Sequence, residues 1–225
     1  MSANGVVIVG AGSSARMGGA DKLFALLAGQ PLLLHSLDAA QRCEMVQQIV
    51  LVVATQRLEE TRCLLAAQPM GKLRAIVPGG ARRQDSVMAG LAALAGVEYV
   101  AIHDAARPLV TPALFGAGFA AVAATGAAIA AVPVVDTLKR AAPDGSVEAT
   151  VSREGLWAVQ TPQVFRYELL LAAHRGSEGD VTDDAMLLEA LGQPVRIFPG
   201  SVRNVKVTTP DDLALAAALL ARQTD

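Results

Sequence analysis

Short apolar runs alternate with longer segments of helical apolar spacing along most of this chain. Apolar runs of roughly 4–8 residues bounded by turn residues are typical of buried strands, whereas apolar residues three and four positions apart are typical of helices. The predicted strands are 6–9, 48–54, 74–77, 99–103, 127–132 and 195–199. The predicted helices are 31–42, 57–68, 83–94, 112–124, 167–175, 183–191 and 211–221.

This alternation predicts an α/β fold, a doubly wound and mostly parallel sheet with right-handed crossovers. We expect a single domain over residues 1–225. The alternation breaks at 134–162, where 136–140 and 147–151 are predicted strands around a turn at 141–145. A β-hairpin inserted into such a sheet has little core of its own, so we expect either a lid or an arm that docks on a second subunit.

The composition supports a large core and argues against two kinds of partner. Hydrophobic residues make up 52% of the 225 positions, charged residues 18%, and the formal net charge is −2. That balance argues against nucleic-acid binding through bulk electrostatics. Prolines and glycines interrupt the uncharged stretch 109–135, which predicts a helix followed by a buried strand and no membrane span.

Cysteine usage and the start of the chain bear on the compartment. The two cysteines, Cys43 and Cys63, lie in segments of helical spacing and suit small buried residues of a reducing compartment. No secretory signal precedes the first predicted strand. We therefore expect a cytoplasmic protein.

The first predicted strand runs into a glycine turn, and residues 10–15 fit the dinucleotide pattern G-x-G-x-x-G/A. A dinucleotide site needs an acidic residue about 20 positions later, at the end of the second strand. Neither 30–35 nor 53–57 contains one, and Arg16 and Lys22 follow the turn instead. The segment is therefore either a plain tight turn or, as the two cations favour, a nest of backbone N–H groups that holds phosphates.

A carboxylate follows the predicted central strand in the motif His-Asp-Ala-Ala-Arg-Pro at 103–108. Asp104 fits Mg²⁺, a hard cation that commonly takes one or two carboxylates together with substrate phosphates. Arg107 suits a second anionic group. The alternative is an aspartate that caps the next turn, with Arg107 as its surface partner. We expect His103 to be a packed or hydrogen-bonded imidazole.

Two further loops carry candidate binding groups. Gly79 and Gly80 precede a predicted helix, where a ligand can approach the backbone at an anion-favouring terminus, or they form an ordinary strand-to-helix turn. Ser86 in the first helical turn is a candidate for reading a base edge. Lys206, in a predicted extended segment before the last helix, is either an edge lysine or a substrate-binding cation. The candidate cations near loops are Arg16, Lys22, Arg83, Arg107, Arg153 and Lys206.

These cations and Asp104 favour phosphoryl or nucleotidyl transfer, in which positioning and charge neutralisation supply most of the catalysis. The segment 11–18 with Lys22 resembles the signature of sugar-phosphate nucleotidyltransferases. Within that group the chain resembles the 2-C-methyl-D-erythritol 4-phosphate cytidylyltransferases. The motifs that carry this closer resemblance are 79–87, 103–108, 136–140, 156–163, 181–184 and 204–208, and the ordered match runs from about 6 to 220.

The resemblance implies a Rossmann-like nucleotidyltransferase fold and a defined reaction. CMP is transferred from CTP to 2-C-methyl-D-erythritol 4-phosphate, giving CDP-methylerythritol and pyrophosphate in the non-mevalonate isoprenoid pathway. The implied catalytic residues are Arg16 and Lys22, and the implied Mg²⁺ ligand is Asp104. Contacts to CTP are implied for Ala11, Gly12, Gly79, Gly80, Arg83, Ser86, Asp104 and Ala105. Contacts to the acceptor are implied for Asp104, Arg107, Thr137, Arg153, Thr161, Thr182 and Lys206.

The resemblance also implies a homodimer, because in this family the hairpin arm hooks onto a neighbouring subunit. Thr137 and Arg153 would then complete the site of the other subunit. Three alternatives remain. A ribitol 5-phosphate cytidylyltransferase would share the fold and the chemistry. An NAD-binding dehydrogenase is disfavoured by the missing ribose-binding acid. A non-catalytic nucleotide-binding module is disfavoured because binding alone does not require Arg16, Lys22 and Asp104 together.

Overall fold

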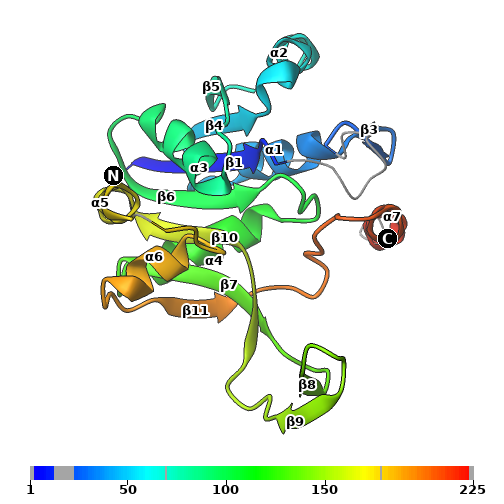
Figure 1. Cartoon of the computed structure of the whole chain (residues 1–225). Coiled ribbons are helices and arrows are strands. Elements are labelled where there is room, and N and C mark those ends of the chain that lie inside the picture. The colour runs from blue at the N-terminus through cyan, green and yellow to red at the C-terminus, as the bar shows by residue number, and fades with distance from the viewer. Residues whose placement is uncertain (1–2, 13–22, 69, 178, 223–225) are drawn as a thin grey trace.

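A computed structural model describes residues 3–12, 23–68, 70–177 and 179–222 of the chain (Figure 1). The strands of its main sheet are β1 (Ala3–Gly10), β4 (Gln48–Val53), β5 (Leu73–Pro78), β6 (Val97–Asp104), β7 (Ala127–Pro133), β10 (Trp157–Arg166) and β11 (Arg196–Pro199). Their order is β11-β7-β10-β6-β1-β4-β5, and only β10 runs antiparallel to its neighbours in this described sheet. Two short hairpins pair β2 (Leu26–Leu27) with β3 (Gln30–Pro31) and β8 (Leu138–Ala141) with β9 (Val147–Val151).

Helices cover both faces of the main sheet. They are α1 (Leu32–Arg42), α2 (Leu58–Ala66), α3 (Arg83–Ala92), α4 (Pro112–Val122), α5 (Tyr167–Gly176), α6 (Ala185–Ala190) and α7 (Pro210–Ala221), with a 3₁₀ turn at Thr55–Arg57. Successive side chains of a strand point to opposite faces. Val6 and Ile8 of β1 therefore pack with α1 and α4, whereas Val7 packs with α3. Burial on both faces explains the continuous apolar runs of the strands, and the doubly wound α/β prediction is confirmed.

Each predicted strand and helix is present, with its ends shifted by a few residues at most, but β10 was not predicted. This strand lies between β6 and β7 in the middle of the sheet. Its polar residues Gln160, Thr161 and Gln163, together with Pro162, interrupt the apolar pattern expected of a central strand. All three polar side chains are buried and hydrogen-bonded. Residues 157–162, placed by the sequence in the hairpin excursion 134–162, thus begin a strand of the main sheet.

The antiparallel direction of β10 matters for the site. The parallel strands β1, β4, β5 and β6 end at one edge of the sheet, whereas β10 begins at that edge. The pairing of Gln163 with Ile102 continues so that Thr161 lies beside Asp104, the last residue of β6. One edge therefore collects the glycine turn after β1, the glycine pair after β5, the end of β6 and the start of β10.

The predicted hairpin is confirmed as β8 and β9, which project away from the main sheet (Figure 1). Most residues of this arm are exposed. The arm and its two connections expose the large apolar side chains of Val135, Val147 and Leu156, and the start of β10 beside them exposes those of Trp157 and Val159. The uncharged stretch 109–135 forms helix α4 and strand β7, as predicted. Among the described residues, no helix is both long enough and apolar enough to cross a membrane.

Candidate active site

Asp104 ends β6 with its carboxylate between two cations. Lys206 Nζ lies 2.6 Å from Asp104 Oδ2, and Arg83 Nε lies 3.4 Å from Asp104 Oδ1. The Asp104 side chain is only 13% exposed. Burial by itself would raise the pKa of this carboxyl, but the charges of Arg83 and Lys206 outweigh burial and hold the pKa of Asp104 well below its usual range. The site therefore keeps a permanent negative charge between two positive ones.

A chain of buried hydrogen bonds holds the backbone of Asp104 from the protein interior. The Asp104 backbone N–H donates to Thr161 Oγ1 at 3.1 Å, and Thr161 Oγ1 lies 3.1 Å from His103 Nδ1. His103 Nε2 lies 3.2 Å from the Arg107 carbonyl, which can only accept. Nε2 therefore carries the proton, and Nδ1 accepts from the Thr161 hydroxyl. The hydroxyl of Thr161, expected to bind the acceptor, is thus engaged by protein groups on both sides.

His103 is the packed imidazole that the sequence predicts. Its side chain is fully buried and meets Phe115 edge-on, with ring centroids 5.3 Å apart. Burial outweighs the favourable charge of Asp104 and lowers the pKa of His103 to about 4. The imidazole is therefore neutral near pH 7 and is committed to its two hydrogen bonds.

The predicted nucleotide-binding loops meet at the same edge. A Cβ added to Gly79 would lie 2.2 Å from Ala11 Cβ and 2.6 Å from Ser86 Oγ. Ser86 Oγ accepts from the Gly80 backbone N–H at 3.2 Å, so the buried hydroxyl fixes the glycine pair on the start of α3. Only a residue without a side chain fits at position 79. The structure thus joins four residues that the resemblance assigns to CTP, namely Ala11, Gly79, Gly80 and Ser86.

The remaining candidates for the nucleotide site and for catalysis differ in burial, and two of them are not described by the structure. Ala105 is fully buried, and its backbone N–H donates to the Val9 carbonyl at 2.9 Å, which ties β6 to β1. Gly12 is exposed, with open space where a Cβ would lie. Arg16 and Lys22, the predicted catalytic residues, lie outside the described residues.

Arg107 points toward the segment that carries Lys206. Its Nη1 donates to the Asn204 carbonyl at 2.8 Å, and the Asn204 side chain donates to the Thr161 carbonyl at 2.8 Å. The buried Nε of Arg107 has no hydrogen-bond partner in the described part of the chain. Burial lowers the pKa of this guanidinium. Arg107 therefore links the end of β6 to the loop before α7.

Among the described residues, no contact brings three of the predicted acceptor-binding residues to Asp104. Thr137 and Arg153 are exposed in the projecting arm, where the Arg153 guanidinium donates to the Val135 carbonyl. Thr182 is exposed in the segment before α6, and its hydroxyl lies 3.9 Å from Met186 Sδ.

Sequence reasoning overlooked two residues behind Arg83. Arg83 Nη1 donates to Asp184 Oδ2 at 2.7 Å, and the other oxygen of Asp184 lies 3.1 Å from His174 Nε2. Asp184 belongs to the motif 181–184, where its acidic character was the available signal. His174 looked like any polar residue of an amphipathic helix, and only its burial distinguishes it.

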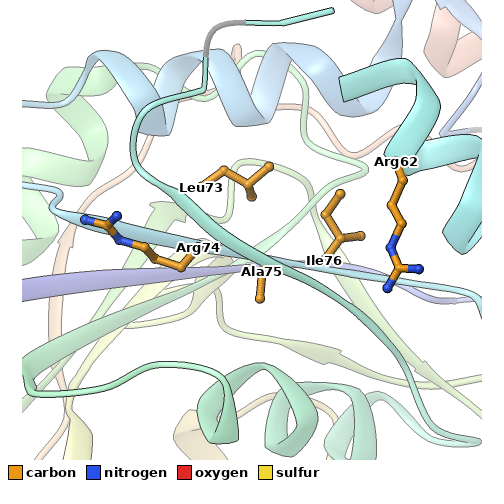
Figure 2. Close-up of a pocket in the computed structure, with 5 residues that line it drawn as sticks. All are labelled: Arg62, Leu73, Arg74, Ala75 and Ile76. Carbon is orange, nitrogen blue, oxygen red and sulfur yellow. The ribbon is translucent and has the colours of Figure 1, made fainter. Parts of the chain in front are cut away.

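A shallow hollow elsewhere on the surface is unrelated to these groups. It lies over β5 beside α2, and Figure 2 shows the side chains that line it, those of Arg62, Leu73, Arg74, Ala75 and Ile76. β5 is one of the two edge strands of the described main sheet. None of the five lining residues belongs to the motifs at the glycine edge, by which we mean the sheet edge with the glycine turn after β1, the glycine pair after β5, the end of β6 and the start of β10.

The donor set at Asp104 bears on the predicted metal. Among the described residues, no group of three or more His, Cys, Asp or Glu side chains could hold a metal ion. Asp104 supplies one ionised carboxylate. Mg²⁺ is commonly bound through one or two carboxylates, with substrate phosphates and water as the other ligands. The site therefore fits a metal that binds together with a triphosphate.

The fold and the cluster of charges at the glycine edge define an α/β nucleotidyltransferase. The family model for 2-C-methyl-D-erythritol 4-phosphate cytidylyltransferase matches residues 5–222. The chain belongs to this family, and it is therefore a cytidylyltransferase of isoprenoid biosynthesis.

Individual relatives agree over nearly the whole chain. The enzyme of this name from Dehalococcoides mccartyi is 48% identical over 216 residues, which cover 96% of this chain and 95% of the relative. That of Pelotomaculum thermopropionicum is 48% identical over 225 residues, covering 96% and 94%. The crystal structure of the Anaerococcus prevotii 4-diphosphocytidyl-2C-methyl-D-erythritol synthase superposes with a TM-score of 0.87 at 30% identity, covering 98% of this chain and 96% of that one. The resemblance stated from the motifs is thereby confirmed, and the ribitol 5-phosphate alternative is not favoured.

Proposed function

We propose that this chain transfers CMP from CTP to 2-C-methyl-D-erythritol 4-phosphate at the sheet edge around Asp104. A phosphate oxygen of the acceptor forms a new bond to the α-phosphorus of CTP. The bond from that phosphorus to the bridging oxygen breaks, and the electron pair leaves with pyrophosphate. The observation that supports this placement is the ionised Asp104 between Arg83 and Lys206, next to the packed Ala11–Gly79–Ser86 contact.

In this proposal the two sides of the edge bind different substrates. CTP lies over the glycine turns, where Gly79 leaves the backbone accessible and Arg83 opens α3. Lys206 faces the acceptor, since its ammonium has three donors, Asp104 uses one, and its side chain is 43% exposed. Arg107 supplies a second cation beside it. Arg16 and Lys22 neutralise charge that builds up on the phosphoryl oxygens in the transition state.

A divalent cation completes the proposed site. Asp104 would hold Mg²⁺ together with the triphosphate, and the bound ion would neutralise phosphate charge. Arg83 and Lys206 prepare Asp104 for this role, because their charges keep its carboxylate ionised and their contacts orient it toward the edge. Thr161 and His103 act below it by fixing the backbone of Asp104.

The acceptor assay tests this proposal. The protein is incubated with CTP, Mg²⁺ and either methylerythritol phosphate or ribitol 5-phosphate, and pyrophosphate release is measured. We expect release with methylerythritol phosphate. Release with ribitol 5-phosphate alone would overturn the choice of acceptor. An unchanged rate in the presence of EDTA would refute the requirement for a divalent cation.

We also propose that the arm mediates a homodimer. The exposed apolar side chains of the arm and its connections support this, because an isolated hairpin with an apolar surface gains stability by covering that surface. Thr137 and Arg153 would then reach the site of the neighbouring subunit. Sedimentation of Val147→Glu tests the arm, and an unchanged molar mass relative to the unsubstituted protein would refute its role.

A cytoplasmic location is the final part of the proposal. Cys43 is buried as predicted, whereas Cys63 is exposed, so its predicted burial is wrong. Both thiols are free, which suits a reducing compartment. Fractionation of cells that produce the protein would test it, and recovery outside the cytoplasmic fraction would refute it.

A further inference from the structure

A continuous series of charged and polar contacts leads from the exposed edge into the protein. It runs from Lys206 through Asp104, Arg83 and Asp184 to His174, with successive contacts of 2.6, 3.4, 2.7 and 3.1 Å. The proposed function uses the first three of these residues. The last two lie beneath them, and the Asp184 side chain is 0% exposed.

A carboxylate with no exposure cannot touch a substrate at the edge, so its role must be exerted through its neighbours. Burying an unpaired carboxylate is costly, and each oxygen of Asp184 has one partner, Arg83 or His174. Arg83 lies closer to Asp184 than to Asp104, at 2.7 against 3.4 Å. Asp184 therefore holds the guanidinium more firmly than Asp104 does. The position of the guanidinium, fixed by Asp184, then determines how it contacts Asp104.

We infer that Asp184, held by His174, is a positioning residue of the active site that fixes Arg83 against Asp104. With Arg83 anchored from behind, one oxygen of Asp104 faces the guanidinium and the other stays on Lys206. Without the negative charge of Asp184, the guanidinium turns toward Asp104 as its remaining carboxylate partner. The arrangement of Asp104 and Lys206 that the substrates meet is then lost. This inference rests on the proposed function of that edge.

The segment around Asp184 has independent attachments, which makes a substitution interpretable. Gln84 donates to the Gly179 carbonyl at 3.0 Å and accepts from the Val181 backbone N–H at 3.3 Å. Gln163 donates to Asp183 Oδ2 at 2.7 Å and accepts from the Ala185 backbone N–H at 3.3 Å. These two buried amides hold the segment on both sides of Asp184. We therefore expect that the segment stays in place when only the Asp184 charge is removed.

A double-mutant cycle tests the inference with Asp184→Asn, Arg83→Gln and the double variant. We expect Asp184→Asn to lower kcat/KM for methylerythritol phosphate at least 10-fold. In the Arg83→Gln background the same change should have an effect of less than 2-fold, because its route of action is gone. A purely structural role would lower activity by the same factor in both backgrounds.

Asp180→Asn is the matched control. Asp180 lies in the same segment and pairs with Arg82 at 3.1 Å, but that pair is exposed and does not reach Asp104. We expect less than a 2-fold change for this variant. Activity of the wild type and of Asp180→Asn tests the proposed function, so a wild type without activity refutes that function. An active wild type with an equally active Asp184→Asn refutes only the positioning role, as do losses that multiply in the double variant.

Folding is checked by circular dichroism and thermal melting. If Asp184→Asn does not fold, the cycle is repeated with His174→Ala, which removes the partner on the far side of Asp184. A loss of 3-fold or more that disappears with Arg83→Gln supports the inference. A loss that is absent, or equal in both backgrounds, overturns it.

Discussion

Lowering the pH from 7.5 to 4.5 should destabilise this protein through one buried imidazole. His103 is fully buried, and burial lowers its pKa from 6.5 to about 4 in the folded protein. Because the folded pKa is the lower one, the unfolded chain takes up the proton first. The stability contributed by neutral His103 is complete above about pH 6.5 and is lost as the pH falls toward 4.

The size of this loss follows from the two pKa values. The difference of 6.5 − 4 = 2.5 pKa units corresponds to a limit of about 3.4 kcal/mol. Between pH 7.5 and 4.5 the linkage relation gives a loss of about 2.5 kcal/mol. The carboxyl of Asp104, whose folded pKa lies well below its usual range, loses its contribution at lower pH. The chosen interval therefore lies above the pH range in which Asp104 loses its contribution.

Urea denaturation across this interval measures the effect, with His103→Gln as the comparison. The glutamine amide offers a donor for the Arg107 carbonyl and an acceptor for Thr161, but it does not titrate. The difference in unfolding free energy between wild type and variant should shrink by about 2.5 kcal/mol as the pH falls to 4.5. Parallel stability curves for the two proteins would refute the assignment of a depressed pKa to His103.

Three further predictions concern the site. Gly79→Ala should raise the KM for CTP and destabilise the fold by about 1–3 kcal/mol, because its Cβ would overlap Ala11; Gly176→Ala, where a Cβ meets open space, is the control for kinetics and melting, and equal behaviour of the two would contradict this. Lys22→Ala should lower kcat far more than it raises the KM for CTP, since its contact strengthens in the transition state; an unchanged kcat would remove it from the mechanism. Arg153→Ala should weaken acceptor binding and spare CTP, and mixed dimers with Lys22→Ala in the other chain test whether the site is shared.

Local patterns in the sequence account for most of the fold. Runs of apolar residues located the parallel strands because both faces of this sheet are buried, so that burial and hydrophobicity coincide residue by residue. Turn residues located the arm at 141–145, and β8 and β9 flank that turn. The same local logic found Asp104 and Gly79, since a polar or glycine residue that follows a buried strand lies at the ligand edge of an α/β sheet.

The strand β10 and the support of the site depended on tertiary structure. No strand was predicted at Gln160 and Gln163, because the burial of these polar side chains depends on partners far along the chain, such as Ser201 and Asp183. Arg83 and Asp184 are separated by 101 positions, and their contact exists only because α3 and the start of α6 meet on one face of the sheet. Hydrophobic periodicity reports which side of an element is buried. It carries no information on which buried polar groups face one another, and that pairing decided how Asp104 is held.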